Sequence, residues 1–198
     1  MGRGKKILDT GVVVEKAIEL IEANGYEDFS TRKLAAQLRI SAMTLYNYYE
    51  NREAILKASI VRAFGILWLG LPEKIENCLG GGENPLRVYS VMVEHLLTFG
   101  LGRPKLYLFL FNADLSSLRW EVGIVDEYRK IFTGVEDRII EKAMGESIYR
   151  DIYLFEVLAN ALIINVLKGR AGLTPEKFHE LMSDAYSRLL QPDEKYFR

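Results

Sequence analysis

Apolar residues recur at helical spacing from the start of the chain, and polar residues mark the helix ends. The apolar face of the first helix consists of Val13, Val14, Ala17, Leu20 and Ile21. This helix follows Asp9-Thr10, and Asn24-Gly25 supplies the left-handed residue at which helices commonly stop. Ser30 and Ser41 can cap two short helices, over residues 31–38 and 42–49, because a serine oxygen accepts a hydrogen bond from a free N–H of the first turn. The pattern therefore predicts three short helices near the N-terminus.

The rest of the chain also has helical spacing. Asn51 can cap a fourth helix that runs to Leu71 and stops before Pro72, and the glycine-rich residues 77–85 are typical of a loop. Further helices are expected over residues 86–99, 104–113, 118–144, 148–168 and 175–190. Because no strand-like alternation is convincing, the predicted fold class is all-α.

Composition narrows the possible functions. Of 198 residues, 49% are hydrophobic and 27% are charged, which is ordinary for a folded globular protein. The formal net charge of -1 means that any nucleic-acid surface must be a local patch. The single cysteine, Cys78, and the two histidines, His95 and His179, are too few for a disulfide framework or a Cys/His zinc site. We therefore expect no cofactor, no metal and no catalytic residues, so the chain is not expected to be an enzyme.

Neither a secretory signal nor a membrane span is expected. Residues 1–10 carry Arg3, Lys5 and Lys6 but lack the apolar region of a signal peptide. The longest apolar-rich stretch, residues 152–167, is too short and too polar to cross a bilayer. With one cysteine in the chain, a cytoplasmic location without membrane contact is the expectation.

Two short capped helices with a tight connection form a helix-turn-helix, whose second helix enters the major groove of DNA. In this arrangement the residues that face a small core are Leu34, Leu38, Ile40, Leu45 and Tyr49. The outward positions of the third helix are Ala42, Met43, Thr44, Tyr46, Asn47 and Tyr48. Hydroxyl groups there can donate to phosphates, Asn47 can read an adenine edge, and Ala42 and Met43 can meet a thymine methyl group.

Local charge agrees with DNA binding. Residues 30–57 contain five basic side chains, Arg32, Lys33, Arg39, Arg52 and Lys57, against Glu50 and Glu53. This excess predicts a phosphate-facing patch. The residues predicted to contact DNA are Thr31, Arg32, Ala42, Met43, Thr44, Tyr46, Asn47, Tyr48 and Arg52. The alternative is that the helix pair and its tyrosines serve packing alone.

Residues 11 to about 57 resemble the DNA-binding domain of the tetracycline-repressor (TetR) family. The family pattern is Thr-Leu-Tyr, any residue, His-Phe, and then a lysine. Thr44-Leu45-Tyr46 matches this pattern, while Tyr48-Tyr49 replaces His-Phe and Arg52 replaces the lysine. Arg39 stands where the family usually has a turn glycine, and a left-handed backbone, if the turn keeps it, is costly for a non-glycine residue.

The resemblance implies an N-terminal three-helix DNA-binding domain, residues 1–52, and a C-terminal helical bundle for ligand binding and dimerisation, residues 53–198. The residues expected to line the effector pocket are Trp68, Tyr89, Met92, His95, Phe99, Tyr107, Phe111, Trp120 and Tyr128. Such a set suits a mostly apolar ligand, which can be cationic or planar. The alternative is that each of these residues is an ordinary core residue.

Residues 152–167 are apolar nearly all round, so one face can pack in its own domain while the other needs a partner. The last helix adds an apolar stripe: Phe178, Leu181, Met182, Ala185 and Leu189. The resemblance implies a homodimer through the helices around 148–168 and 175–190. Two recognition helices would then read palindromic double-stranded DNA. The alternative is a buried helix in a monomer.

By resemblance, the expected function is a transcription repressor that leaves its operator when a small, mostly apolar effector binds. The effector would tilt the helix over residues 52–71 and change the spacing of the recognition helices. The alternative is a DNA-binding protein of the same fold that lacks a small-molecule effector and is controlled by a protein partner. A filled C-terminal core would favour this alternative.

Overall fold

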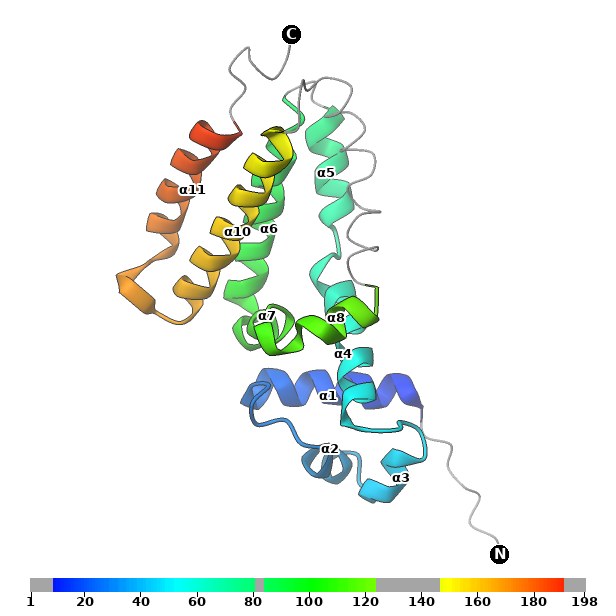
Figure 1. Cartoon of the computed structure of the whole chain (residues 1–198). Helices are drawn as coiled ribbons and strands as arrows, with labels where there is room; N and C mark the ends of the chain where they lie inside the picture. Colours follow the sequence, from blue (N-terminus) through cyan, green and yellow to red (C-terminus); the bar gives the residue numbers. More distant parts are fainter. Residues whose placement is uncertain (1–8, 81–83, 124–146, 191–198) are drawn as a thin grey trace, which may run out of the picture. The chain divides into compact units, whose positions relative to one another are not determined.

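The computed structural model describes residues 9–80, 84–123 and 147–190, and every regular element within these ranges is a helix (Figure 1). The predicted all-α fold class is confirmed. The chain divides into two compact units, Met1–Leu67 with Arg103–Val125, and Trp68–Gly102 with Asp126–Arg198. These units are defined by how the helices pack. The predicted functional division into a DNA-binding domain, residues 1–52, and an effector-binding and dimerisation domain, residues 53–198, stays a prediction.

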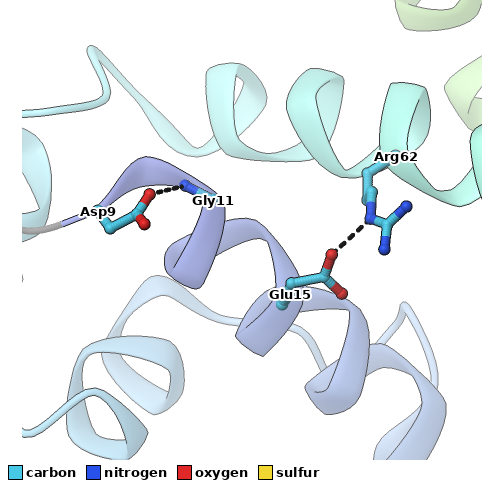
Figure 2. A network of polar contacts seen from close by, with 4 residues as sticks. All are labelled: Asp9, Gly11, Glu15 and Arg62. Atoms are coloured by element: carbon cyan, nitrogen blue, oxygen red, sulfur yellow. Dashed lines mark hydrogen bonds and ion pairs between the residues drawn. The ribbon is translucent and has the colours of Figure 1, made fainter.

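The first unit is organised around α1 (Thr10–Asn24). At its start, the Asp9 side chain accepts a hydrogen bond from the Gly11 N–H at 2.8 Å (Figure 2). At its end, Gly25 takes a φ of 91°. One face of α1 is buried and packs against α4 (Arg52–Leu67) and α7 (Pro104–Leu110). Figure 2 also shows the ion pair between Glu15 of α1 and Arg62 of α4. The expected start and stop signals of the first helix are confirmed.

The other elements of the first unit are α2 (Thr31–Gln37), α3 (Ala42–Tyr46), the 3₁₀ helix η1 (Ala113–Leu115) and α8 (Ser116–Glu121). The Asn51 side chain accepts a hydrogen bond from the Ala54 N–H at 2.8 Å, as predicted for the cap of α4. The start of α7 is tied to the end of α1, because Lys105 donates to the Ala23 carbonyl and Arg103 lies 3.4 Å from the Glu22 carboxylate. Helices far apart in the sequence thus share one core with α2 and α3.

The second unit contains α5 (Leu71–Gly80), α6 (Arg87–Gly102), α10 (Ser147–Leu167), the 3₁₀ helix η2 (Arg170–Gly172) and α11 (Pro175–Leu189). Helix α6 packs on α5 and α10, and α10 lies beside α11 (Figure 1). The Thr174 hydroxyl accepts a hydrogen bond from the Lys177 N–H at 3.3 Å, and Pro175 occupies the first turn, as predicted.

Several helix boundaries differ from the predictions. The helices expected over residues 86–99 and 104–113 are Arg87–Gly102 and Pro104–Leu110. The fourth helix ends at Leu67 rather than Leu71, and residues 77–80, expected in a loop, are the last residues of α5. Gly70, with a φ of 78°, separates the two helices. Pro72 lies in the first turn of α5, where backbone N–H groups make no intrahelical hydrogen bond, so the lack of an N–H in proline costs nothing there. The third helix ends at Tyr46 rather than Tyr49.

The first part of the helix predicted over residues 118–144 also differs from the prediction, because the observed helix ends soon after residue 118. Helix α8 begins at Ser116 and ends at Glu121, and Gly123 has a left-handed φ of 67°. Glycine adopts this conformation readily and continues no helix there. Residues 124–144 of the predicted helix lie outside the described residues.

One helical stretch, Arg52–Gly80, is long and apolar enough to cross a membrane by length and composition alone. It consists of the two helices α4 and α5, with the break at Gly70 between them. Ile55, Ile60 and Leu67 of α4 are at most 1% exposed and belong to the core. A helix buried in the core of a protein can have the same length and apolar composition as a membrane-spanning helix.

Candidate nucleic-acid interface

Helices α2 and α3 each begin at a serine whose side chain closes the first turn. The Ser30 hydroxyl accepts a hydrogen bond from the Lys33 N–H at 3.2 Å, and the Ser41 hydroxyl accepts one from the Thr44 N–H at 3.0 Å. The Ser41 and Thr44 hydroxyls also lie 2.8 Å apart. Caps of this kind matter for α3, because a helix of five residues is too short to be stable by backbone bonds alone. Both predicted caps are confirmed.

The turn between the two helices is closed by backbone hydrogen bonds around Arg39. The Arg39 N–H donates to the Ala36 carbonyl at 3.1 Å, and the Ile40 N–H donates to the Ala35 carbonyl at 3.0 Å. This pair of bonds is the Schellman motif, which requires a left-handed residue at its centre. Arg39 has a φ of 56°, so the turn keeps its left-handed backbone although this residue is not glycine.

Helix α3 has a buried side and an exposed side, as the helix-turn-helix interpretation requires. Leu34 of α2 and Leu45 of α3 are fully buried, and the other three predicted core residues, Leu38, Ile40 and Tyr49, are half-buried. On the outward side Met43 is 78% exposed and Tyr46 is 44% exposed. Asn47 is also exposed, whereas Ala42, Thr44 and Tyr48 are half-buried. An accessible surface with hydroxyl, amide and apolar groups therefore lies on α3.

Two tyrosine hydroxyls hold this surface to its neighbours. The Thr31 and Tyr46 hydroxyls lie 3.0 Å apart and join the start of α2 to the end of α3. The Tyr49 hydroxyl donates to the Thr10 carbonyl at 3.0 Å and so links the segment after α3 to α1. Burial, helped by the nearby Asp9 carboxylate, raises the pKa of Tyr49. These bonds fix α3 against the rest of the unit.

The basic residues of this segment divide into packed and outward-facing ones. The Arg52 guanidinium is half-buried and lies 5.5 Å from the ring centre of Tyr26 and 5.6 Å from that of Phe29. Lys57 forms an ion pair with Glu121 of α8. Arg32, Lys33 and Arg39 are exposed, and the Lys33 ammonium also donates to the Asp28 carbonyl at 3.1 Å. The exposed positive charge is therefore concentrated on α2 and the turn.

The predicted effector-lining residues fall in both units. Trp68, Tyr89, Met92, His95 and Phe99 belong to the second unit, where the Lys74 ammonium lies 3.1 Å from Nδ1 of His95. Tyr107 and Phe111 belong to the first unit, with ring centres 4.5 Å apart. Tyr107 is fully buried, and this burial raises its pKa above the usual range. Tyr128 and the side chain of Trp120 lie outside the described residues, so the pocket stays a prediction.

Helix α10 presents apolar side chains to solvent in the second unit. Its exposed large hydrophobic residues are Tyr149, Tyr153, Leu154, Val157 and Leu158, and Leu181 of α11 is exposed as well. The opposite side of α10 is buried through Ile152, Phe155 and Ile163. An apolar face remains on the two helices predicted to dimerise.

Sequence reasoning missed the contribution of α7 to this site. Lys105 and Arg103 hold the end of α1, yet about eighty residues separate them from Ala23 and Glu22. No local spacing can reveal a contact of this kind. The packing role of Arg52 was missed as well, and the aromatic residues at 26 and 29 were its only signal.

A capped helix pair with a buried inner side and an exposed polar outer side, carried on a helical scaffold, defines the class of helix-turn-helix regulators. Residues 13–59 match the family model described as bacterial regulatory proteins, tetR family. On this match, residues 13–59 form an N-terminal domain of the TetR family type.

Among curated proteins, the chain is similar to the tetracycline repressor protein class G of Vibrio anguillarum, with 37% identity over 51 residues. The match covers 26% of this chain and 24% of the length of that relative. It supports the N-terminal domain alone.

Solved structures extend the likeness to the whole fold. A TetR family transcription regulator from Marinobacter aquaeolei has a TM-score of 0.64 and 17% identity over 96% of each chain. FadR of Thermus thermophilus, a TetR family transcriptional repressor in complex with lauroyl-CoA, has a TM-score of 0.62 and 18% identity over 93% of this chain and 97% of that chain. At such low identities the likeness shows a shared fold.

Proposed function

We propose that this chain is a homodimeric transcription repressor that binds a palindromic operator through α2 and α3 and is released by a small, mostly apolar effector. The observation that carries the DNA-binding part is the outward side of α3, where Met43, Tyr46 and Asn47 are exposed while Leu45 anchors the helix in the core. A DNA-binding role carries the expectation of a cytoplasmic protein without membrane contact.

Each outward group has an assigned role. Asn47 makes paired hydrogen bonds to an adenine, and Ala42 and Met43 contact thymine methyl groups. Thr44 and Tyr48 donate to phosphates. Thr31 and Tyr46 act together, because one of their two hydroxyl protons is used in the bond between them and the other is left to donate to a phosphate. Arg32 and Arg52 add positive charge near the backbone.

The DNA-binding part is tested by selecting duplexes from a pool with about 30 random base pairs, which is room for two half-sites at least one helical turn apart. We expect the purified chain to enrich a palindromic sequence. Failure to enrich any sequence, together with no duplex binding at low salt, would overturn the proposal.

Two substitutions then separate base reading from phosphate binding. Asn47→Ala should lose about 1–3 kcal/mol of discrimination at one base pair of the selected duplex and lose less on a scrambled duplex. Tyr48→Phe should weaken binding to both duplexes by a similar factor. An equal loss on both duplexes for Asn47→Ala would contradict its role as a base reader.

The homodimer is supported by the face of α10 that stays exposed in a single chain. Tyr153, Leu154 and Val157 lie there, and Leu181 of the adjacent α11 adds to it. One side of α10 is already buried in its own unit, so the exposed apolar side needs another surface to cover it. Two-fold pairing of α10 and α11 gives a four-helix interface and presents two recognition helices to a palindrome.

The effector part is supported by the apolar and aromatic side chains of α6, which include Tyr89, Met92 and Phe99. We propose a mostly apolar ligand, and the solved FadR structure suggests lauroyl-CoA as one probe beside a planar phenol and a lipophilic cation. One of these should lower affinity for the selected duplex by favouring a different spacing of the two α3 helices. If no such molecule changes DNA affinity or dimer geometry, the small-molecule effector is refuted and control by a protein partner becomes the better account.

A further inference from the structure

The conformation of Arg39 is unfavourable for the residue that adopts it. Within the described residues, Arg39 and Ala171 are the non-glycine residues with positive φ. A left-handed backbone brings the Cβ atom of an L-residue close to its own carbonyl oxygen, a cost that glycine avoids. The backbone bonds that close the turn, from the N–H groups of Arg39 and Ile40, need no side chain at position 39. Folding of the turn therefore favours glycine here.

The Arg39 side chain has no stabilising role that would offset this cost. The residue is exposed, and its guanidinium has no hydrogen bond, ion pair or ring contact within the part of the chain that the structure describes. The flanking Leu38 and Ile40 are half-buried and occupy the inner side of the turn, so the side chain between them extends into solvent. A strained position that carries an unpaired outward charge points to a use outside the fold.

The surroundings of Arg39 indicate what this charge meets. Residues 30–49 contain three basic side chains, Arg32, Lys33 and Arg39, and no acidic one. Arg39 stands three residues before Ala42, the first residue of α3. When a recognition helix enters the major groove, the segment leading into it passes beside the phosphates that border the groove. A long cation at this point faces the most strongly charged part of the duplex.

We infer that Arg39 binds a backbone phosphate of double-stranded DNA at the edge of the major groove, and that its left-handed backbone is retained for this contact. The inference rests on the proposed DNA-binding function and adds a contact residue to it. It implies that stability and DNA affinity change in opposite directions when this arginine is replaced by glycine.

The test compares the full-length wild-type chain with Arg39→Gly, Arg39→Asn and Arg39→Lys on the selected duplex and on a scrambled one. We expect Arg39→Gly to raise the thermal midpoint and yet weaken binding to both duplexes by a similar factor. Arg39→Gly removes two arginines per dimer, so the slope of log K against log salt should become less negative by about 1.8. The factor by which affinity drops between about 50 and 200 mM salt should then be about 12-fold smaller than for the wild type. Asparagine tolerates the left-handed backbone without carrying charge, and Arg39→Asn should show the same change of slope.

Two controls complete the experiment. Arg39→Lys keeps both the charge and the strained backbone and should retain the wild-type slope. Arg170→Gln removes an exposed arginine from the second unit and should leave the slope unchanged. Wild-type affinity and slope in both Arg39→Gly and Arg39→Asn, or tighter binding by Arg39→Gly, would overturn the role of Arg39. A wild-type chain that binds no duplex would instead overturn the proposed function itself.

Discussion

Replacing Val157 with lysine tests whether the exposed face of α10 is a dimer interface. Val157 lies midway along α10 and is 48% exposed in the single chain. Its apolar neighbours Tyr153, Leu154, Leu158 and Leu181 have exposed fractions between 37% and 64%. A lysine at position 157 would place a charge within the surface that the proposed dimer buries.

The expected effect follows from these exposed fractions. The five side chains together expose about the equivalent of two whole side chains per protomer. Full burial of a large apolar side chain stabilises by about 1.5–3 kcal/mol, so the face supplies about 6–12 kcal/mol per dimer. An uncompensated charge at an interface costs about 3 kcal/mol at the lower end, and two-fold symmetry introduces two of them. A loss of about 6 kcal/mol corresponds to a dissociation constant raised about 10⁴-fold.

If the dimer dissociation constant of the wild type is nanomolar, that of Val157→Lys falls within the range of about 0.1 to 100 µM chain that sedimentation velocity can cover. We expect wild-type dimers and Val157→Lys monomers over most of this range. Val61 of α4 offers a matched control, because it is the same residue with the same 48% exposure on a different helix. Val61→Lys should remain dimeric. A dimer of Val157→Lys with an unchanged dissociation constant would refute the assignment of this face.

Three further substitutions test the scaffold around α3. Ser41→Ala removes the cap of the five-residue helix α3, so it should lower the free energy of unfolding in urea by about 1 kcal/mol and weaken operator binding. Ser41→Thr keeps the hydroxyl and should keep most of the stability and of the operator affinity. Unchanged unfolding of Ser41→Ala would contradict a capping role. Arg52→Ala removes the guanidinium from the rings of Tyr26 and Phe29 and should cost about 1 kcal/mol in the same assay, and a neutral result would argue against the ring contacts. Leu106→Ala empties a fully buried position of α7 and should cost about 2–5 kcal/mol and reduce hydrogen-exchange protection of α1 amides, whereas Leu97→Ala in the second unit should leave α1 protected. Equal loss of α1 protection in both leucine variants would contradict the division into two units.

The helix-turn-helix was predictable because its determinants are local. Ser30 and Ser41 act on N–H groups three residues away, and the family pattern marked Arg39 as the turn residue. The alternation of buried Leu45 with exposed Met43 and Tyr46 also follows from spacing within one helix. Such signals lie within a few residues of the groups that they affect.

The break between α4 and α5 was less predictable because proline has two meanings at a helix end. Pro72 was interpreted as a stop, but proline is equally suited to the first turn of a new helix. Gly70 carried the signal for the break, since it supplies the positive φ two residues earlier. The buried pair Leu71 and Ile75 is too short a run to predict a helix by periodicity alone.

The packing also bears on how the proposed effector would influence α2 and α3. The chain passes between the units at Leu67–Trp68 and again at Gly102–Arg103, and the helices on the first-unit side, α4 and α7, both pack on α1. A ligand shifts an equilibrium only through contacts that differ between two states, so any change has to reach α1 along helices that contact it. The predicted tilt of α4 cannot be treated alone, because Lys105 and Arg103 of the α7 start hold the end of α1. A tilt that moved α4 by itself would have to break its packing on α1 or that of α1 on α7. For the proposed effector mechanism, we therefore expect the lower-cost motion to carry α1, α4 and α7 together. This expectation makes α7 part of the proposed coupling, although the predicted domain boundary at residue 52 assigns it to the effector domain.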